Sequence, residues 1–457
     1  MRYPAKNHAR KVAELYKKLG GTETDYLVYL PATETKLWPH CDQTVPLRQS
    51  RYFNYITGAF DKPDAHVVYD VKSDKLTLYL PPIDEDDVMW SGMPISPEDA
   101  LAAYDVDAVE YSDKLEAVLS GRTALTVDAS EKYPSVKACP KLLEAFDESR
   151  VIKDEFELNL LRKAAQVTDN SHMAVMSAMP IQKNEGHIHA EFVYHAMRQG
   201  SKNQAYDPIC CAGTNAGTLH YVKNDEDIVG RLLILIDAGA EWQTYAADVT
   251  RVFPLTGEWT KECREIYELV LDMQKQALDR IRPGVNYEEL HIQAHRILID
   301  KFLELGIFKN GTTDDILKSG LSAAFYPHGL GHMLGMDTHD PAGWANYEDP
   351  DPKLRYLRIR RTLQENMVLT VEPGCYFNNY LIDPYRSGQE STAAASYLDE
   401  KVLEKYMPVG GVRIEDDIVV TKDGHENFTK MTKDPEEISR IVKDGIRKGR
   451  GHFHCVV

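Results

Sequence analysis

The sequence predicts an α+β protein with two domains: a smaller α/β domain over residues 1–150 and a larger domain over residues 151–457. Three observations support this fold class. A chain of 457 residues is long enough for two or three domains with a large core. The first 150 residues alternate between helical and strand patterns. The rest contains a helix–proline–helix–strand pattern twice, which predicts a pseudo-symmetric domain with helices backing a curved antiparallel sheet.

In the first domain, we expect a helix over Lys6–Leu19 and short strands near Tyr26–Leu30 and Tyr52–Thr57. The segment HVVYDVKSDKLTLYLP is typical of a β-hairpin, with Ser73-Asp74 at its turn. The remaining predicted elements are a helix over Pro97–Tyr104, a strand near Ala108–Tyr111, a short helix and the strand ALTVD. This half of the sequence contains no set of residues typical of a catalytic site.

In the second domain, two pairs of helices make the repeat. A long helix that ends at Pro180 precedes a helix that begins near Glu185. A second long helix ends at Pro283 and precedes a helix that begins near Tyr287. One offset relates the two prolines and also relates Glu185 to Glu288. A site between the two halves would therefore take residues from both.

Composition excludes several classes of partner. The net charge of −18 argues against a nucleic-acid-binding surface or an anionic membrane as partner. No apolar run is as long as a membrane span, and the basic N-terminus MRYPAKNHARKVAELYKK lacks the apolar core of a secretory signal. The cysteine count of seven is odd, with no CxxC pair, which is typical of a reducing compartment. We therefore expect a cytoplasmic protein.

The first chemical signal is LLILIDAGAEWQTYAADVTRVFP, two apolar strands around a polar turn. If Trp242-Gln243 is the two-residue loop, Asp237 and Asp248 lie directly opposite each other. Like charges in that position destabilise a hairpin, and a bound cation relieves the repulsion. The alternative is a half-exposed sheet on which both carboxylates stay in water.

The second signal is FYPHGLGHMLGMDTHD, with three histidines among three glycines. His328 and His332 are four residues apart, and His339 follows seven residues later. Glycine lets the backbone approach a ligand closely, and neutral imidazole suits first-row divalent metals. Gly329 excludes the HExxH motif of a zincin helix. Core packing explains any one of these histidines but not all three.

Two further strands contribute carboxylates. MVLTVEPGCYF ends in Glu372, whose charge at the end of a buried strand needs a partner. In GGVRIEDDIVV, strand alternation places Arg413, Glu415 and Asp417 on one face, although a surface ion pair also explains the first two. Oxygen-rich ligation with a single imidazole suits Mn²⁺, with Co²⁺ or Zn²⁺ as alternatives. Two metals that share carboxylates can hold a bridging hydroxide and polarise a carbonyl together.

The ordered set IDAGAEW, ADVTRVFP, HGLGHMLGMDTHD, TVEPGCYF and GVRIEDDIVVT resembles the pita-bread metallopeptidases: prolidase, aminopeptidase P and, more distantly, methionine aminopeptidase. The resemblance covers residues 155–435, and residues 1–150 more loosely resemble the N-terminal domain of creatinase and aminopeptidase P. It implies a pita-bread catalytic domain that hydrolyses the bond before proline in Xaa-Pro peptides. No ligand position departs from the family pattern, which counts against the metal-free members of this fold.

The resemblance also implies residue roles. The implied metal ligands are Asp237 for the first ion, Asp248 and Glu415 for both ions, and His332 and Glu372 for the second. Glu372 is also the implied proton shuttle. The other implied catalytic residues are His220, His339 and Arg413, and the implied substrate-binding residues are His328, Arg358, Tyr206 and Trp90. Two divalent ions per subunit and a homodimer through the N-terminal domain complete the expectation.

The link PAGWANYEDPDPKLRYLRIRRTLQEN distinguishes two activities within this family. A long link that contains LRYLRIRR resembles eukaryotic prolidases, in which an arginine at the position of Arg358 closes the site to longer peptides. We therefore predict an Xaa-Pro dipeptidase. The alternative is an Xaa-Pro aminopeptidase that acts on longer peptides. A scaffold without catalysis is a third possibility, and it would purify without metal.

Overall fold

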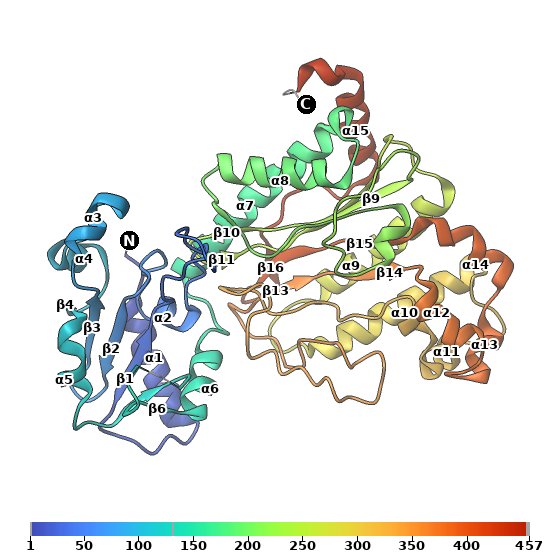
Figure 1. Cartoon of the computed structure of the whole chain (residues 1–457). Coiled ribbons are helices and arrows are strands. Elements are labelled where there is room, and N and C mark those ends of the chain that lie inside the picture. The colour runs from blue at the N-terminus through green and yellow to red at the C-terminus, as the bar shows by residue number, and fades with distance from the viewer. Residues whose placement is uncertain (1, 130–131, 454–457) are drawn as a thin grey trace. The chain divides into compact units, whose positions relative to one another are not determined.

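The computed structural model describes residues 2–129 and 132–453, and the chain divides into two compact units, Met1–Val151 and Ile152–Val457 (Figure 1). Each unit has its own sheets and its own helices. Across the described residues, no helix combines the length and the apolar character that a bilayer span requires.

A six-stranded sheet with the order β4-β3-β2-β1-β5-β6 forms the centre of the N-terminal unit (Figure 1). The pairs β1–β2 and β2–β3 are antiparallel, whereas β3–β4, β1–β5 and β5–β6 are parallel. The strands are β1 (Leu27–Pro31), β2 (His66–Asp70), β3 (Lys75–Leu80), β4 (Ala108–Tyr111), β5 (Ala124–Thr126) and β6 (Lys137–Ala138). The helices are α1 (Ala5–Lys18), α2 (Arg51–Tyr55), α3 (Glu85–Ser91), α4 (Pro97–Ala103), α5 (Leu115–Leu119) and α6 (Pro140–Ser149).

One predicted element of this unit is wrong. The segment predicted as a strand over Tyr52–Thr57 contains helix α2 instead. Ser50 caps the helix by accepting a hydrogen bond from the N–H of Phe53, and the Thr57 hydroxyl donates to the carbonyl of Phe53. These local hydrogen bonds outweigh the β-preference of the aromatic residues in this segment. The predicted hairpin is confirmed, with β2 and β3 paired in register.

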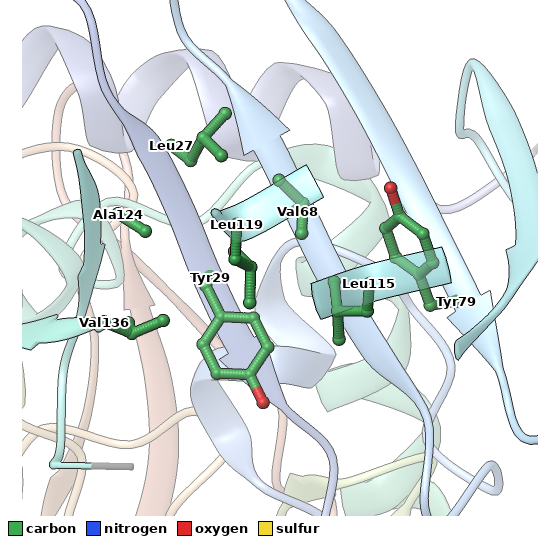
Figure 2. Close-up of a cluster of buried hydrophobic side chains, with 8 residues drawn as sticks. All are labelled: Leu27, Tyr29, Val68, Tyr79, Leu115, Leu119, Ala124 and Val136. Atoms are coloured by element: carbon green, nitrogen blue, oxygen red, sulfur yellow. The ribbon is translucent and has the colours of Figure 1, made fainter. Parts of the chain in front are cut away.

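One hydrophobic core cluster of the N-terminal unit lies between its sheet and helix α5. Figure 2 shows Leu115 and Leu119 of α5 facing side chains of the strands beneath, among them Tyr29 and Val68. Both leucines are at most 1% exposed. Full burial of a leucine side chain contributes about 1.5–3 kcal/mol, so α5 is held by its apolar face despite its single turn and a half.

All strand pairs of the second unit are antiparallel among the described residues. Its sheets have the orders β11-β10-β7, β12-β9-β8, β13-β16-β17 and β14-β15. The strands are β7 (Asn203–Gln204), β8 (Ile209–Ala212), β9 (Leu233–Asp237), β10 (Ala240–Trp242), β11 (Tyr245–Ala246), β12 (Thr250–Pro254), β13 (Val368–Val371), β14 (Gly374–Tyr376), β15 (Gly411–Arg413), β16 (Asp416–Val420) and β17 (His425–Asn427).

The long helices of this unit pack in pairs against the strands, α7 with α8 and α9 with α10 (Figure 1). Helix α7 also contacts β10, and α9 contacts β13, β14 and β15. The helices are α7 (Glu155–Ser177), α8 (Glu185–Arg198), α9 (Lys261–Arg280), α10 (Tyr287–Leu305), α11 (Thr313–Ser319), α12 (Asn379–Arg386), α13 (Thr392–Tyr397), α14 (Glu400–Tyr406) and α15 (Pro435–Lys448).

The internal repeat is present, but its two halves correspond one residue earlier than the sequence indicated. Asn184 caps α8 and Asn286 caps α10, and both cap residues form an isolated β-bridge, to Asp227 and to Thr362 respectively. Glu185 therefore corresponds to Tyr287 and not to Glu288. The prolines cannot set the register, because the connections between paired helices differ in length.

Candidate metal centre

Asp237 and Asp248 lie on the same side of a hairpin, but not directly opposite each other. Asp237 ends β9 and pairs with Thr250, the first residue of β12. The turn is Gln243-Thr244, both with positive φ (49° and 73°). The predicted loop at Trp242-Gln243 is therefore wrong. A partner shift of two residues leaves every side chain on its original face, so the carboxylates still converge.

A tyrosine and an arginine contact this aspartate pair. The Tyr206 hydroxyl is hydrogen-bonded to both Asp237 and Asp248. Arg413 Nη2 donates to Asp237 Oδ2 at 2.6 Å. Burial alone would raise the pKa of Asp237, but Arg413 and Tyr206 lower it below its ordinary value. Burial and the charges of Asp237 and Glu372 raise the pKa of Asp248 well above its ordinary value.

His332 is held in the tautomer that can bind a metal through Nε2. Its backbone pairs with Thr370 of β13, and its Nδ1 lies 3.0 Å from the carbonyl of Met333, to which it donates. The lone pair of Nε2 then faces Asp248 Oδ2 at 3.2 Å and Glu372 Oε1 at 3.5 Å. Burial lowers the pKa of His332 to about 4, so the ring is neutral near pH 7. The Nε2 lone pair and the carboxylate oxygens are all acceptors, so they repel one another. A cation bound between them turns this repulsion into attraction.

Glu372 follows β13, and Glu415 lies between β15 and β16. Thr250 Oγ1 donates to Glu415 Oε2 at 2.6 Å. Burial, followed by the charges of neighbouring carboxylates, raises the pKa of both glutamates well above the ordinary value. Arg413 and Glu415 are 4% and 1% exposed, so the alternative of a surface ion pair is wrong. Asp417 lies on the predicted face and accepts the N–H of Asp248.

These residues form a donor set that fits divalent cations. Ligand atoms of Asp248, His332 and Glu415 all lie within 4.8 Å of one another. Asp237 and Glu372 border the same cavity. Three buried carboxylates, the half-buried Glu372 and one neutral imidazole are an oxygen-rich set, and such sets suit Mn²⁺ and related ions. We call these five residues, Asp237, Asp248, His332, Glu372 and Glu415, the metal centre.

The metal centre borders a cavity of about 310 Å³. Predicted substrate-site residues in its wall are His220, His328, His339, Arg358 and Arg413. His328 Nε2 lies 2.8 Å from the Tyr376 hydroxyl, and the rings of His332 and His339 meet edge to face at 4.5 Å. Burial lowers the pKa of His328 to about 3 and that of His339 to about 2. Both rings are therefore neutral hydrogen-bonding groups near pH 7.

Trp90 belongs to the other unit. It lies on α3 of the N-terminal unit, and 80% of its surface is exposed. Its predicted role in substrate binding stays a prediction.

The arginines of LRYLRIRR differ in their partners. Arg358 Nη1 donates to the Tyr347 hydroxyl at 3.0 Å and lines the cavity. Arg360 instead pairs with Glu288 and Asp349, and the Arg361 guanidinium lies 4.0 Å from the ring centre of Trp344. The cavity wall also contains residues that the sequence did not single out, namely Leu219, Tyr347, Tyr356 and Leu381. One indication of them was present in the sequence: Tyr347, Tyr356 and Leu381 lie in the long segments on either side of Glu372.

Removal of metal with a chelator is expected to lower the melting temperature by several degrees. A ligand at about 100 times its Kd stabilises the folded state by about 2.7 kcal/mol. The raised pKa values of Asp248, Glu372 and Glu415 favour folding below their ordinary pKa range, and this contribution is lost as the pH rises through the raised values. Stabilisation by added Mn²⁺ should therefore be larger at pH 8 than at pH 6.

Thermal melts before chelation, after chelation and after Mn²⁺ is restored measure this effect. Elemental analysis of the same samples gives the metal content. An unchanged melting temperature in a sample that has lost its metal would contradict the expectation.

The sequence is similar to those of known proteins over both units. A family model described as metallopeptidase family M24 matches residues 159–422, and one described as aminopeptidase P, N-terminal domain matches residues 8–127. The chain is 49% identical to an uncharacterized peptidase of Saccharomyces cerevisiae, over 100% of this chain and 87% of the relative. It is 45% identical to a probable Xaa-Pro aminopeptidase of Botryotinia fuckeliana, over 97% of each chain.

Solved structures show the same similarity. Aminopeptidase P from E. coli, with the inhibitor Pro-Leu, superposes with a TM-score of 0.79 at 27% identity, over 98% of this chain and 100% of the other. The predicted fold class is therefore confirmed: an N-terminal domain of the aminopeptidase P type and a C-terminal pita-bread domain. The M24 model contains all five positions of the metal centre, and the family name implies divalent metal ions. The chain belongs to metallopeptidase family M24.

Proposed function

We propose that this metallopeptidase is an Xaa-Pro aminopeptidase, which releases the N-terminal residue from peptides with proline in second position. The observation that carries the proposal is a metal centre beside a cavity whose wall also contains His220, His328 and His339. A relative named as a probable Xaa-Pro aminopeptidase, similar over 97% of this chain, supports the substrate class. The sequence favoured the dipeptidase, and the named relatives support its alternative better.

We assign two divalent ions to the metal centre, with Mn²⁺ as the native metal. Asp237 would hold the first ion, and His332 with Glu372 the second. Asp248 and Glu415 would be shared, because Asp248 lies near both Asp237 and the imidazole of His332, and Glu415 has a ligand atom within 4.8 Å of those of Asp248 and His332. When bound, such ions lower the pKa of a water molecule and polarise the carbonyl of the scissile bond.

The protein's own groups would handle protons and substrate. Glu372 Oε2 lies 3.8 Å from His328 Nδ1 at the cavity wall, where it can take a proton from water and pass one to the leaving proline nitrogen. The neutral rings of His328 and His339, together with His220, would hydrogen-bond the peptide. Arg413 would hold Asp237 in place through their 2.6 Å ion pair.

The dipeptidase remains a second candidate because of Arg358. Its hydrogen-bond partner is the neutral hydroxyl of Tyr347, whereas Arg360 in the same segment is paired with carboxylates. Arg358 therefore offers a positive charge at the cavity wall, with no ion pair to a carboxylate among residues 2–129 and 132–453. The free carboxylate of a dipeptide's proline would fit that charge, and a longer peptide would lack it there.

Arg358→Ala is expected to raise KM for Gly-Pro about tenfold or more, with a smaller effect on Xaa-Pro-Xaa tripeptides. A hydrogen bond to a charged group contributes about 1.5–3 kcal/mol, which sets this magnitude. Initial rates with both substrates, with Mn²⁺ added, measure it. Arg355→Ala is the matched control, because Arg355 donates to the Asp349 carbonyl and does not line the cavity.

The wild-type rates decide between the two candidates. Cleavage of Xaa-Pro-Xaa at least as fast as Gly-Pro supports the aminopeptidase. Cleavage of Gly-Pro alone establishes the dipeptidase, and no cleavage of either substrate with metal bound would overturn both. A homodimer and a cytoplasmic location stay predictions, and light scattering and cell fractionation test them.

A further inference from the structure

The loop that carries His220 into the cavity is tied to one buried carboxylate. This loop, residues 213–225, connects β8 to the strand region before β9 and places Leu219 and His220 in the cavity wall. Both of its ends meet Glu185, the first residue of α8. Glu185 is 0% exposed and lies outside the wall of the cavity.

Four donors converge on the Glu185 carboxylate. Oε1 accepts the N–H of Ala212 at 2.8 Å and the side-chain amide of Asn215 at 2.9 Å. Oε2 accepts the Tyr221 hydroxyl at 2.9 Å and the N–H of Glu226 at 3.1 Å. Two of these donors are the backbone groups that flank the loop, and two are side chains inside it, Asn215 and Tyr221, of which Tyr221 directly follows His220. A carboxylate, which only accepts hydrogen bonds, is the side chain that can satisfy all four.

Further hydrogen bonds join the start of α8 to the end of the loop. The N–H of Glu185 donates to the Glu226 carbonyl at 2.9 Å, and the N–H of Ile228 donates to the Lys183 carbonyl at 3.0 Å. Asn184 adds a side-chain bond to the Asp225 carbonyl at 2.8 Å. The loop is therefore closed at its base, and Glu185 is the side chain that reaches from this base to the segment beside His220.

In the other half of the repeat, the first residue of the second helix also holds a segment of the site. Tyr287 corresponds to Glu185 and is likewise 0% exposed. Its hydroxyl donates to the carbonyl of Thr370 at 2.9 Å. Thr370 in turn pairs with the backbone of His332 and lies two residues before Glu372. In both halves, the buried first residue of the second helix holds a segment that carries a residue of the site.

We infer that Glu185 is a positioning residue for substrate binding: it sets the place of His220 and Leu219 in the cavity without touching the substrate. The inference deepens the proposed function and rests on it where activity is the readout. Its physical basis does not depend on the metal centre, since the contacts of Glu185 lie in a separate network. A second, metal-independent measurement can therefore test it.

Glu185→Gln preserves the size of the side chain but turns one acceptor oxygen into an amide that donates. That amide then faces a backbone N–H that can only donate, from Ala212 or from Glu226, so at least one of the four hydrogen bonds is lost even if the Tyr221 hydroxyl turns to accept. We expect kcat/KM for an Xaa-Pro-Xaa peptide to fall about tenfold or more, mainly through KM. Amides in 212–226 should exchange with deuterium about tenfold faster or more, while amides of β9 and β12 keep their rates.

A double-mutant cycle separates positioning from general stability. If Glu185 acts through His220, the double variant Glu185→Gln/His220→Ala should be no less active than His220→Ala alone, within about twofold. Glu191→Gln is the matched control, because Glu191 is a buried acid on the same helix that bonds His195 one turn away. It should leave KM and the exchange of 212–226 unchanged.

Each result either supports or overturns the positioning role of Glu185. Additive losses in the cycle, or unchanged exchange in 212–226, would overturn the inference. If Glu185→Gln does not fold, Tyr221→Phe removes a single donor, and raised KM with faster exchange in 212–226 would support the inference, whereas no change in either would overturn it. A wild-type protein inactive on every Xaa-Pro peptide would refute the proposed function and leave the exchange experiment as the test of Glu185.

Discussion

Replacement of Glu372 by glutamine is expected to lower kcat by about 10²–10⁴-fold, the usual contribution of a positioned proton-transfer group. An amide cannot take the proton that the attacking water loses or deliver one to the proline nitrogen. Glu372 suits this task because its carboxylate lies at the cavity wall, where Oε2 is 3.8 Å from His328 Nδ1. Its Oε1 also lies 3.5 Å from His332 Nε2, so part of the loss would come from weaker binding of the second ion.

Steady-state kinetics together with elemental analysis separate these two contributions. Glu365→Gln is the matched control, since Glu365 is an exposed acid in the turn before β13. The variant should keep the activity of the wild type. If Glu372→Gln retains both ions and a kcat near that of the wild type, Glu372 is not the proton-transfer group.

Asp248→Asn is expected to abolish activity and to deplete both ions. Asp248 lies between the two parts of the metal centre: it shares the Tyr206 hydroxyl with Asp237 and lies 3.2 Å from His332 Nε2. Loss of an outer partner of a metal ligand typically costs 10–100-fold in metal affinity, so loss of a shared ligand should cost more than about 100-fold. An uncharged amide also removes one of the four negative charges that attract the ions to the metal centre.

Elemental analysis after dialysis gives the metal content of Asp248→Asn directly. Asp272→Asn, a change of an exposed acid on α9 that bonds Gln276, should leave metal content and rate unchanged. A variant that loses one ion and keeps the other at full occupancy would show that Asp248 is not shared. The two-ion assignment would then need revision.

The convergence of Asp237 and Asp248 was predictable although their exact pairing was not. The predicted hairpin turn was wrong, but strand side chains alternate with period two. A partner shift of two residues therefore still placed Asp237 and Asp248 on one face. The three histidines were likewise found from composition and spacing, and the structure brings all three to one cavity wall.

Other features could not be predicted, because they depend on contacts between distant segments. Four arginines of LRYLRIRR are alike in sequence, and only their partners in space distinguish Arg358 from Arg360. The strand predicted over Tyr52–Thr57 failed because a cap from Ser50 outweighed the preference of the aromatic residues. Glu185 was noticed as part of the repeat, but its four donors come from residues that follow it by 27 to 41 positions.

Substrate length is a separate difficulty. The sequence favoured a dipeptidase from a long link and one arginine, whereas several relatives are named as probable Xaa-Pro aminopeptidases. The chemistry of the metal centre is the same for both. We propose that the difference lies at the cavity wall, where Arg358 would recognise the free carboxylate of a dipeptide.

The division of the metal centre between the two halves of the repeat has a consequence for biosynthesis. Asp237 and Asp248 leave the ribosome with the first half, whereas His332, Glu372 and Glu415 follow with the second. A growing chain thus exposes two carboxylates that can attract cations but cannot hold them as the finished site does. On the proposed metal assignment, an incomplete chain cannot hydrolyse peptides until Glu415 has been synthesised and the two halves of the second unit have folded onto each other.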